Sequence, residues 1–225
     1  MPDSPRDSES PRIAVFDAYG TLFDVHAAVA RHAGAVGPDA DRLSEIWRAK
    51  QLEYSWVLGL MGRHAPFWDL TEQALDYALA CCPGVDRALR APLLDAYRDL
   101  DAYPEVLGTL RALRAAGWRT AILSNGDAGM LERAVASAGL ADDLDAVLSV
   151  EAARTFKTAP AAYRLATEQF GAAPGAVLFC SSNRWDVAGA AAFGFRPVWV
   201  NRKGLPEEYP DHPPDRVIGS LDALL

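Results

Sequence analysis

Short apolar runs recur along the chain, and each is followed by polar residues. The first run ends at Asp17. Short hydrophobic runs bounded by turn-forming residues are typical of buried β-strands. The pattern therefore predicts five strands, at residues 13–16, 120–123, 146–148, 176–179 and 197–200.

Amphipathic helical patterns separate several of these runs. The apolar positions within residues 106–113 repeat at helical spacing, with Pro104 before them and Gly117 just after. A second pattern starts after Asp127 and closes at Gly139. Proline near the start and glycine past the end are typical of helix boundaries. Strands that alternate with helices predict an α/β fold with a parallel sheet, in which ligands bind beyond the carboxyl ends of the strands.

The stretch at residues 25–100 interrupts this alternation. It contains no β-type run, and its apolar residues recur at helical spacing. We therefore expect a helical cap subdomain at 25–100, inserted into an α/β core of residues 12–24 and 101–225. Residues 1–11 are rich in Ser, Pro, Asp and Arg and lack an apolar run, which predicts a disordered tail and not a signal peptide or membrane anchor.

Charge and cysteine content narrow the functional classes. The formal net charge is −8 over 225 residues, and no Lys/Arg block stands out. Nucleic-acid binding requires a positive surface, so we expect a small-molecule partner and neither nucleic acid nor a membrane. The three cysteines form no CxxC pair, so neither a disulfide framework nor a zinc site is indicated. We expect a cytoplasmic protein.

Four clusters of polar residues lie at or near the ends of the predicted strands. Because a parallel sheet brings these ends to one edge, we expect the clusters to converge. A carboxylate is a competent nucleophile when it is held against an electrophile in a site that excludes water. The clusters are Asp17 with Tyr19 and Thr21, Ser124 with Asn125, Lys157, and Ser181-Ser182-Asn183 with Asp186.

Each cluster also has a purely structural interpretation. Asp17 could form a turn, Ser124-Asn125 could cap the following helix, and Lys157 could be an ordinary surface lysine. The chain contains no GxSxG, Walker, GxGxxG or HExxH motif. Serine-hydrolase, nucleotide-binding and zinc-protease chemistries are therefore not indicated.

Taken together, these motifs resemble those of the haloacid dehalogenase superfamily, and within it the (S)-2-haloacid dehalogenases of type II. The resemblance runs from about residue 13 to the C-terminus. It implies a Rossmann-like parallel sheet core with an inserted helical cap, and hydrolysis of short (S)-2-haloalkanoic acids to (R)-2-hydroxyalkanoic acids plus halide. The matching segments are residues 16–26, 47–54, 123–126, Lys157 and 181–186.

The resemblance also implies a role for each matching residue. Asp17 would attack C2 of the 2-haloacid and form an aspartyl ester, which water then cleaves. The substrate carboxylate would be held by Ser124, Asn125 and the backbone N–H groups of Ala18 and Tyr19, and the halide would be accepted by Arg48 and Asn125. The nucleophile and the water would be oriented by Thr21, Lys157, Tyr163, Ser181, Asn183 and Asp186. The apolar wall of the site would consist of Tyr19, Leu52, Phe67 and Trp185.

The role of Arg48 depends most on the resemblance. At about 100° per residue, Arg48 lies off the apolar face of its helix, in a stripe with Leu52 and Ser55. This pattern alone indicates a solvated arginine. The resemblance predicts instead that the stripe faces a cleft.

Two other functions stay open: a phosphatase of the same superfamily, and a catalytically silent binding member. Such phosphatases carry a second Asp two residues after the nucleophile and acidic residues in the last loop, which together hold magnesium. Here Tyr19 and the Ser181-Ser182-Asn183 loop take those places, so we expect no metal and no cofactor. The intact set of Asp17, Lys157 and Asp186 argues against a silent member.

Homodimers are common among similar proteins, so we expect a homodimer.

Overall fold

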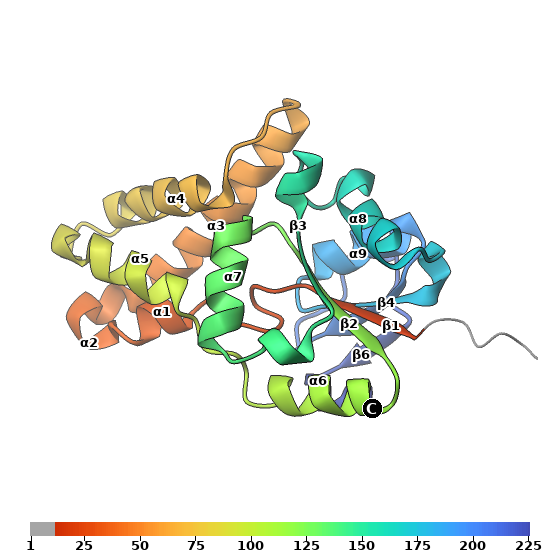
Figure 1. The fold of residues 1–225 in the computed structure, drawn as a ribbon. Coiled ribbons are helices and arrows are strands. Elements are labelled where there is room, and N and C mark those ends of the chain that lie inside the picture. The colour runs from red at the N-terminus through yellow and green to blue at the C-terminus, as the bar shows by residue number, and fades with distance from the viewer. Residues whose placement is uncertain (1–11) are drawn as a thin grey trace, which may run out of the picture.

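The computed structural model describes residues 12–225 and contains a six-stranded parallel sheet in the order β3-β2-β1-β4-β5-β6 (Figure 1). All five predicted strands are present. The sixth, β6, was not predicted, because it has three residues and two of them are exposed. The predicted disordered tail, residues 1–11, lies outside the described residues. The strands are β1 (Ile13–Phe16), β2 (Arg119–Ser124), β3 (Ala146–Ser149), β4 (Val177–Ser181), β5 (Arg196–Val200) and β6 (Arg216–Ile218).

Strand β1 lies inside the sheet and determines where its polar neighbours meet. All four of its residues are fully buried, as is typical of a central parallel strand. In the register of the sheet, Phe16 pairs with Ile122 of β2 and with Cys180 of β4. Since the three strands run in the same direction, the polar residues at their C-terminal ends meet at one edge of the sheet. This is the edge at which the sequence predicts the site.

Four helices connect the strands of the core. The two helical patterns recognised here in the sequence are both helices, α6 and α7. Gly117 and Gly139 follow them with φ angles of 80° and 66°, which glycine adopts without the steric cost that a Cβ imposes. The core helices are α6 (Val106–Ala115), α7 (Ala128–Ser137), α8 (Pro160–Phe170) and α9 (Arg184–Phe193). Short 3₁₀ turns lie at Gly37–Asp39, Arg87–Leu89, Ala141–Asp143, Val150–Ala153, Pro174–Ala176 and Leu221–Leu224.

A separate group of helices lies beside the core and forms the predicted helical insertion (Figure 1). Residues 25–100, all of them described, contain helices and turns but no strand. The limits of the cap at residues 25 and 100 stay a prediction. Among the helices of residues 12–225, none offers the unbroken apolar length that crossing a bilayer needs. The cap helices are α1 (Ala27–Ala30), α2 (Ala33–Val36), α3 (Ala40–Leu60), α4 (Phe67–Cys81) and α5 (Arg90–Arg98).

The chain enters and leaves the cap through two neighbouring segments. The Asp24 N–H donates to the Asp101 carbonyl at 3.1 Å, and the Tyr103 N–H donates to the Leu22 carbonyl at 2.9 Å. These hydrogen bonds join the two connections between cap and core. The first connection begins a few residues after Asp17, so the cap is attached next to the predicted nucleophile.

Candidate active site

Asp17 stands directly after β1, at the edge of the sheet. Only 5% of the residue is exposed. Its Oδ1 accepts a hydrogen bond from Lys157 Nζ at 3.0 Å. Its Oδ2 accepts hydrogen bonds from Asn183 Nδ2 at 2.8 Å and from the Thr21 hydroxyl at 3.0 Å. Donors from three different loops therefore hold one buried carboxylate in a single orientation.

Lys157 lies between two buried carboxylates. Its Nζ is 3.0 Å from Asp17 Oδ1 and 2.7 Å from Asp186 Oδ2, and its side chain is 1% exposed. Burial opposes the ammonium charge, but the two carboxylates outweigh burial and raise the pKa of Lys157 above its ordinary value. Lys157 therefore supplies the positive charge that offsets both carboxylates. The alternative that Lys157 is an ordinary surface lysine is therefore wrong.

Asp186 is fully buried in the first turn of α9. Burial raises the pKa of Asp186 to about 6, while Lys157 acts in the opposite direction. The Tyr163 hydroxyl, from α8, donates to Asp186 Oδ1 at 2.8 Å. Burial, and next the charge of Asp186, raise the pKa of Tyr163 well above its ordinary value, so the phenol stays a donor. Tyr163 positions Asp186, which in turn holds Lys157.

The loop after β4 closes on Thr21. The Ser182 N–H donates to Thr21 Oγ1 at 2.8 Å, and the Thr21 hydroxyl has the acceptors Asp17 Oδ2 at 3.0 Å and Ser182 Oγ at 3.2 Å. Ser181 Oγ accepts from the Asn183 N–H at 3.1 Å. Ser181 thereby shapes the turn from which Asn183 reaches Asp17.

The loop after β2 presents a buried donor without a partner. Asn125 Oδ1 accepts from the backbone N–H of Lys157 at 2.9 Å, whereas Asn125 Nδ2 is buried and has no hydrogen-bond partner in the described structure. Ser124 Oγ accepts from the Gly126 N–H at 3.1 Å and so shapes the loop. Leaving a buried donor unpaired costs roughly 1–3 kcal/mol, so a donor in this position favours an anionic ligand.

The structure turns Arg48 toward the core. Arg48 is half-buried on α3, and its Nη2 donates to the Tyr19 carbonyl at 3.3 Å. Ser55 is fully buried and lines a cavity together with Lys157, and Leu52 is half-buried between them. The helical pattern alone was wrong about this stripe. The α3 helix packs on α4, while Arg48 reaches the Tyr19 carbonyl and Ser55 lines a cavity with Lys157.

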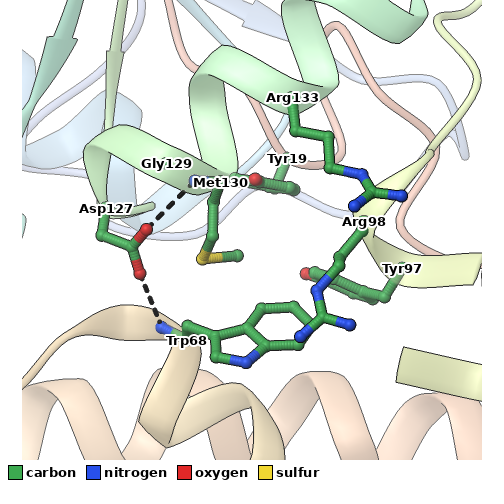
Figure 2. A pocket seen from close by; sticks show the side chains of 8 residues that line it. All are labelled: Tyr19, Trp68, Tyr97, Arg98, Asp127, Gly129, Met130 and Arg133. Atoms are coloured by element: carbon green, nitrogen blue, oxygen red, sulfur yellow. Dashed lines mark hydrogen bonds between the residues drawn. The ribbon is translucent and has the colours of Figure 1, made fainter. Parts of the chain in front are cut away.

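Three residues of the predicted apolar wall, Tyr19, Phe67 and Trp185, lie in three different environments. The Tyr19 ring stacks on Tyr97 at 5.8 Å between centroids, and both line a cavity of about 260 Å³ between α7 and the cap (Figure 2). Trp185 meets Trp56 of α3 edge to face at 5.4 Å and therefore joins the core to the cap. Phe67 is 2% exposed within the hydrophobic core.

Asp127 joins the cap to the core. Its Oδ1 accepts from the Met130 N–H of α7 at 3.0 Å, and its Oδ2 accepts from the Trp68 N–H of α4 at 3.0 Å (Figure 2). One carboxylate thus caps two helix N-termini, where helix dipoles favour negative charge. The sequence indicates only the cap of α7, which follows Asp127 directly, because Trp68 of α4 lies 59 residues away.

The residues around Asp17 differ from a typical magnesium site. Within residues 12–225, no three or more His, Cys, Asp or Glu side chains are grouped so that they could hold a metal ion. Lys157 and Asn183 already donate to the two oxygens of Asp17. Magnesium prefers several oxygen ligands in octahedral geometry. The absence of a metal and of a cofactor stays a prediction.

Comparison with known proteins identifies the family. Residues 11–194 match the family model of the haloacid dehalogenase-like hydrolases. The chain belongs to this family. The expectation drawn from the sequence motifs is therefore confirmed, and the parallel sheet agrees with it.

Several relatives of this haloacid dehalogenase-like hydrolase are similar over nearly their whole length. (S)-2-haloacid dehalogenase 1 of Pseudomonas sp. (strain CBS-3) is 48% identical over 95% of this chain and 94% of its own. (S)-2-haloacid dehalogenase 4A of Burkholderia cepacia is 46% identical over 96% of this chain and 94% of its own. One similar solved structure is that of L-2-haloacid dehalogenase from Xanthobacter autotrophicus with chloropropionic acid covalently bound. Its TM-score is 0.85 at 39% identity, and the match covers 95% of this chain and 96% of that chain.

Proposed function

We propose that this chain hydrolyses short (S)-2-haloalkanoic acids to (R)-2-hydroxyalkanoic acids and halide, with Asp17 as the covalent nucleophile. The observation that carries the proposal is the buried Asp17 carboxylate, held by Lys157 at 3.0 Å and Asn183 at 2.8 Å next to an unpaired Asn125 donor. A nucleophile in a fixed orientation and a donor for an anion are the two elements that this reaction needs. The names of the relatives support the same substrate class.

The first step is a displacement at C2. The Asp17 carboxylate forms a bond to C2 from the side opposite the halogen, and the halogen leaves as an anion with the bonding electron pair. Asn125 Nδ2 and the loop shaped by Ser124 bind the substrate carboxylate, together with the backbone N–H groups of Ala18 and Tyr19. Arg48 and Asn125 stabilise the departing halide, because charge that develops in a transition state is best met by donors already in place.

The second step hydrolyses the aspartyl ester. Water attacks the side-chain carbonyl of Asp17, and the C2–oxygen bond made in the first step stays in the product. Asn183 and Thr21 surround one carboxylate oxygen and Lys157 the other, so they hold the ester carbonyl in place. Asp186, supported by Tyr163, and Ser181 orient the loop residues and the water. Tyr19, Leu52, Phe67 and Trp185 complete the apolar wall that limits other water molecules.

The proposed function predicts that only one enantiomer of the substrate is consumed. Backside attack and a carboxylate clamp together fix the handedness at C2, so (S)-2-chloropropanoate should release chloride and the (R) enantiomer should remain. Chloride release from each pure enantiomer, beside a p-nitrophenyl phosphate assay, is the measurement. Phosphate release without chloride release would favour the phosphatase, and no turnover of either would favour the silent binding member.

Replacing Arg48 should slow turnover. The Arg48→Ala variant loses a donor for the leaving halide, and the loss of one such donor lowers kcat by about 100-fold as an order of magnitude. Chloride release at saturating (S)-2-chloropropanoate is the measurement. The matched control is Arg42→Ala on the same helix, whose arginine is exposed, and it should keep its turnover. Near-normal turnover of Arg48→Ala would assign Arg48 a purely structural contact with the Tyr19 carbonyl.

Chelation should leave the reaction unchanged. Tyr19 and the Ser181-Ser182-Asn183 loop replace carboxylates that a magnesium site needs, and Lys157 and Asn183 already bond to Asp17. The initial rate of chloride release with excess EDTA should therefore equal the untreated rate. A rate that falls with EDTA and returns with magnesium contradicts this prediction.

We also infer a homodimer and a cytoplasmic location. The homodimer is supported by how common homodimers are among similar proteins and the location by the sequence, and both stay predictions. Light scattering coupled to gel filtration measures the oligomeric state, and a mass equal to one chain would contradict the dimer.

A further inference from the structure

A cavity of about 180 Å³ adjoins the groups that surround the nucleophile. Arg48 and Asn183 line it, and each donates to the Tyr19 carbonyl at 3.3 Å. Asn183 also donates to Asp17 at 2.8 Å. The cavity therefore begins where the halide is released in the proposed reaction.

Two further cations, Arg202 and Lys203, line the same cavity. Arg202 Nη2 donates to the Thr21 carbonyl at 2.8 Å, and Arg202 Nε is buried without a partner in the described structure. Within residues 12–225, neither Arg48 nor Lys203 lies within ion-pair distance of a carboxylate. Lys203 is one of only three lysines in a chain of net charge −8, so this positive cavity contrasts with the protein as a whole.

Nearby carboxylates reduce the positive charge of the cavity without cancelling it. Glu105 pairs with Arg202 at 2.6 Å, and Asp24 accepts the His26 N–H at 3.0 Å. His26 also lines the cavity, but burial, and next the charge of Lys203, lower its pKa, so it is neutral at neutral pH. Three cations thus line the cavity, and among the described residues that line it there is no carboxylate, so the cavity favours a small monoanion.

A wider cavity of about 400 Å³ shares His26 and Lys203 with this one. It is also lined by Asp41 and Glu45, which are both exposed. These carboxylates repel an anion, so its binding weakens from Lys203 outward. The two cavities meet at His26 and Lys203, and the outer one is the less favourable for an anion.

We propose that the cavity between Arg48 and Lys203 is a halide-binding site, which receives the leaving halide from Arg48 and passes it to the outer cavity. The halide arrives as a monoanion that already carries the bonding electron pair. Its transfer frees Arg48 for the next substrate molecule. The inference rests on the proposed function for the source of the halide, whereas binding of added halide to the cavity does not depend on turnover.

Crystals soaked in bromide test the site directly. We expect an anomalous bromine peak in contact with Arg202 or Lys203 in the wild-type protein, and a weaker peak in Lys203→Gln crystals soaked in the same way. A peak at Arg48 alone, no peak, or equal peaks in both proteins would overturn the proposal.

Inhibition by chloride tests the same site in solution. At constant ionic strength, Lys203→Gln should raise the inhibition constant for chloride about five-fold, because one unit charge a few ångströms away is lost. The matched control is Lys50→Gln, which changes the net charge equally at a lysine paired with Glu53 and should leave the constant unchanged. An unchanged constant in Lys203→Gln, or equal increases in both variants, would overturn the proposal. A wild-type protein that releases no halide from any 2-haloacid would instead contradict the proposed function, and the bromide maps would still decide the site.

Discussion

In a single turnover with enzyme in excess, run in ¹⁸O-water, the label should enter Asp17 while the 2-hydroxy acid stays unlabelled. The covalent route makes the C2–oxygen bond of the product from an Asp17 carboxylate oxygen, and water attacks only the side-chain carbonyl of the ester. The structure favours this route because Lys157, Asn183 and Thr21 hold the carboxylate in one orientation. Mass spectrometry of the peptide that contains Asp17 and of the product measures where the label goes.

The same experiment distinguishes the covalent route from its simplest competitor. If Asp17 acts only as a general base, water attacks C2 directly, and the label appears in the product and never in the Asp17 peptide. Both routes invert the centre at C2, so product stereochemistry cannot separate them. The Asp17→Asn variant is a weaker companion, because its inactivity fits either role.

Replacing Lys157 with Met should lower both stability and activity. The substitution leaves Asp17 and Asp186 buried without their shared countercharge, and breaking a buried ion pair in this way costs about 3–5 kcal/mol of unfolding free energy. Turnover should fall by about 1000-fold, since Lys157 belongs to a group that acts as a unit on the nucleophile. Urea unfolding and chloride release are the two measurements.

A second variant separates the charge effect from loss of packing. Lys157→Met with Asp186→Asn removes one of the two unpaired carboxylates, so it should recover part of the stability but none of the turnover.

The stability lost in Lys157→Met should also shrink at acidic pH. Burial without the countercharge raises the pKa of Asp186 in the folded protein, so its part of the loss is complete above that pKa and disappears below the pKa of the unfolded chain. Equal losses at all pH values would mean that Lys157 acts mainly by packing.

Local patterns were sufficient to predict five of the six strands and the position of the proposed nucleophile. Five strands follow from short buried runs such as residues 13–16, and two core helices follow from helical spacing closed by Gly117 and Gly139. A parallel sheet then brings the ends of its strands to one edge, which is why Asp17, Asn183 and Lys157 could be expected together. The motifs around Asp17 resemble one family, and the comparisons confirm that membership.

Interactions between distant segments were decided only by the tertiary structure. Helical spacing describes the face of α3 that packs on α4, but it does not show that Arg48, outside that face, donates to the Tyr19 carbonyl of the core. Asp127 caps α4 as well as α7, and Arg202 reaches the Thr21 carbonyl over 181 residues of sequence separation. Periodicity reports which residues of one element share a face, and it carries no information on which other element covers that face. The sequence by itself therefore determined five strands, the helical insertion and the place of Asp17, whereas the packing of distant segments decided the cation-lined cavity beside Asp17.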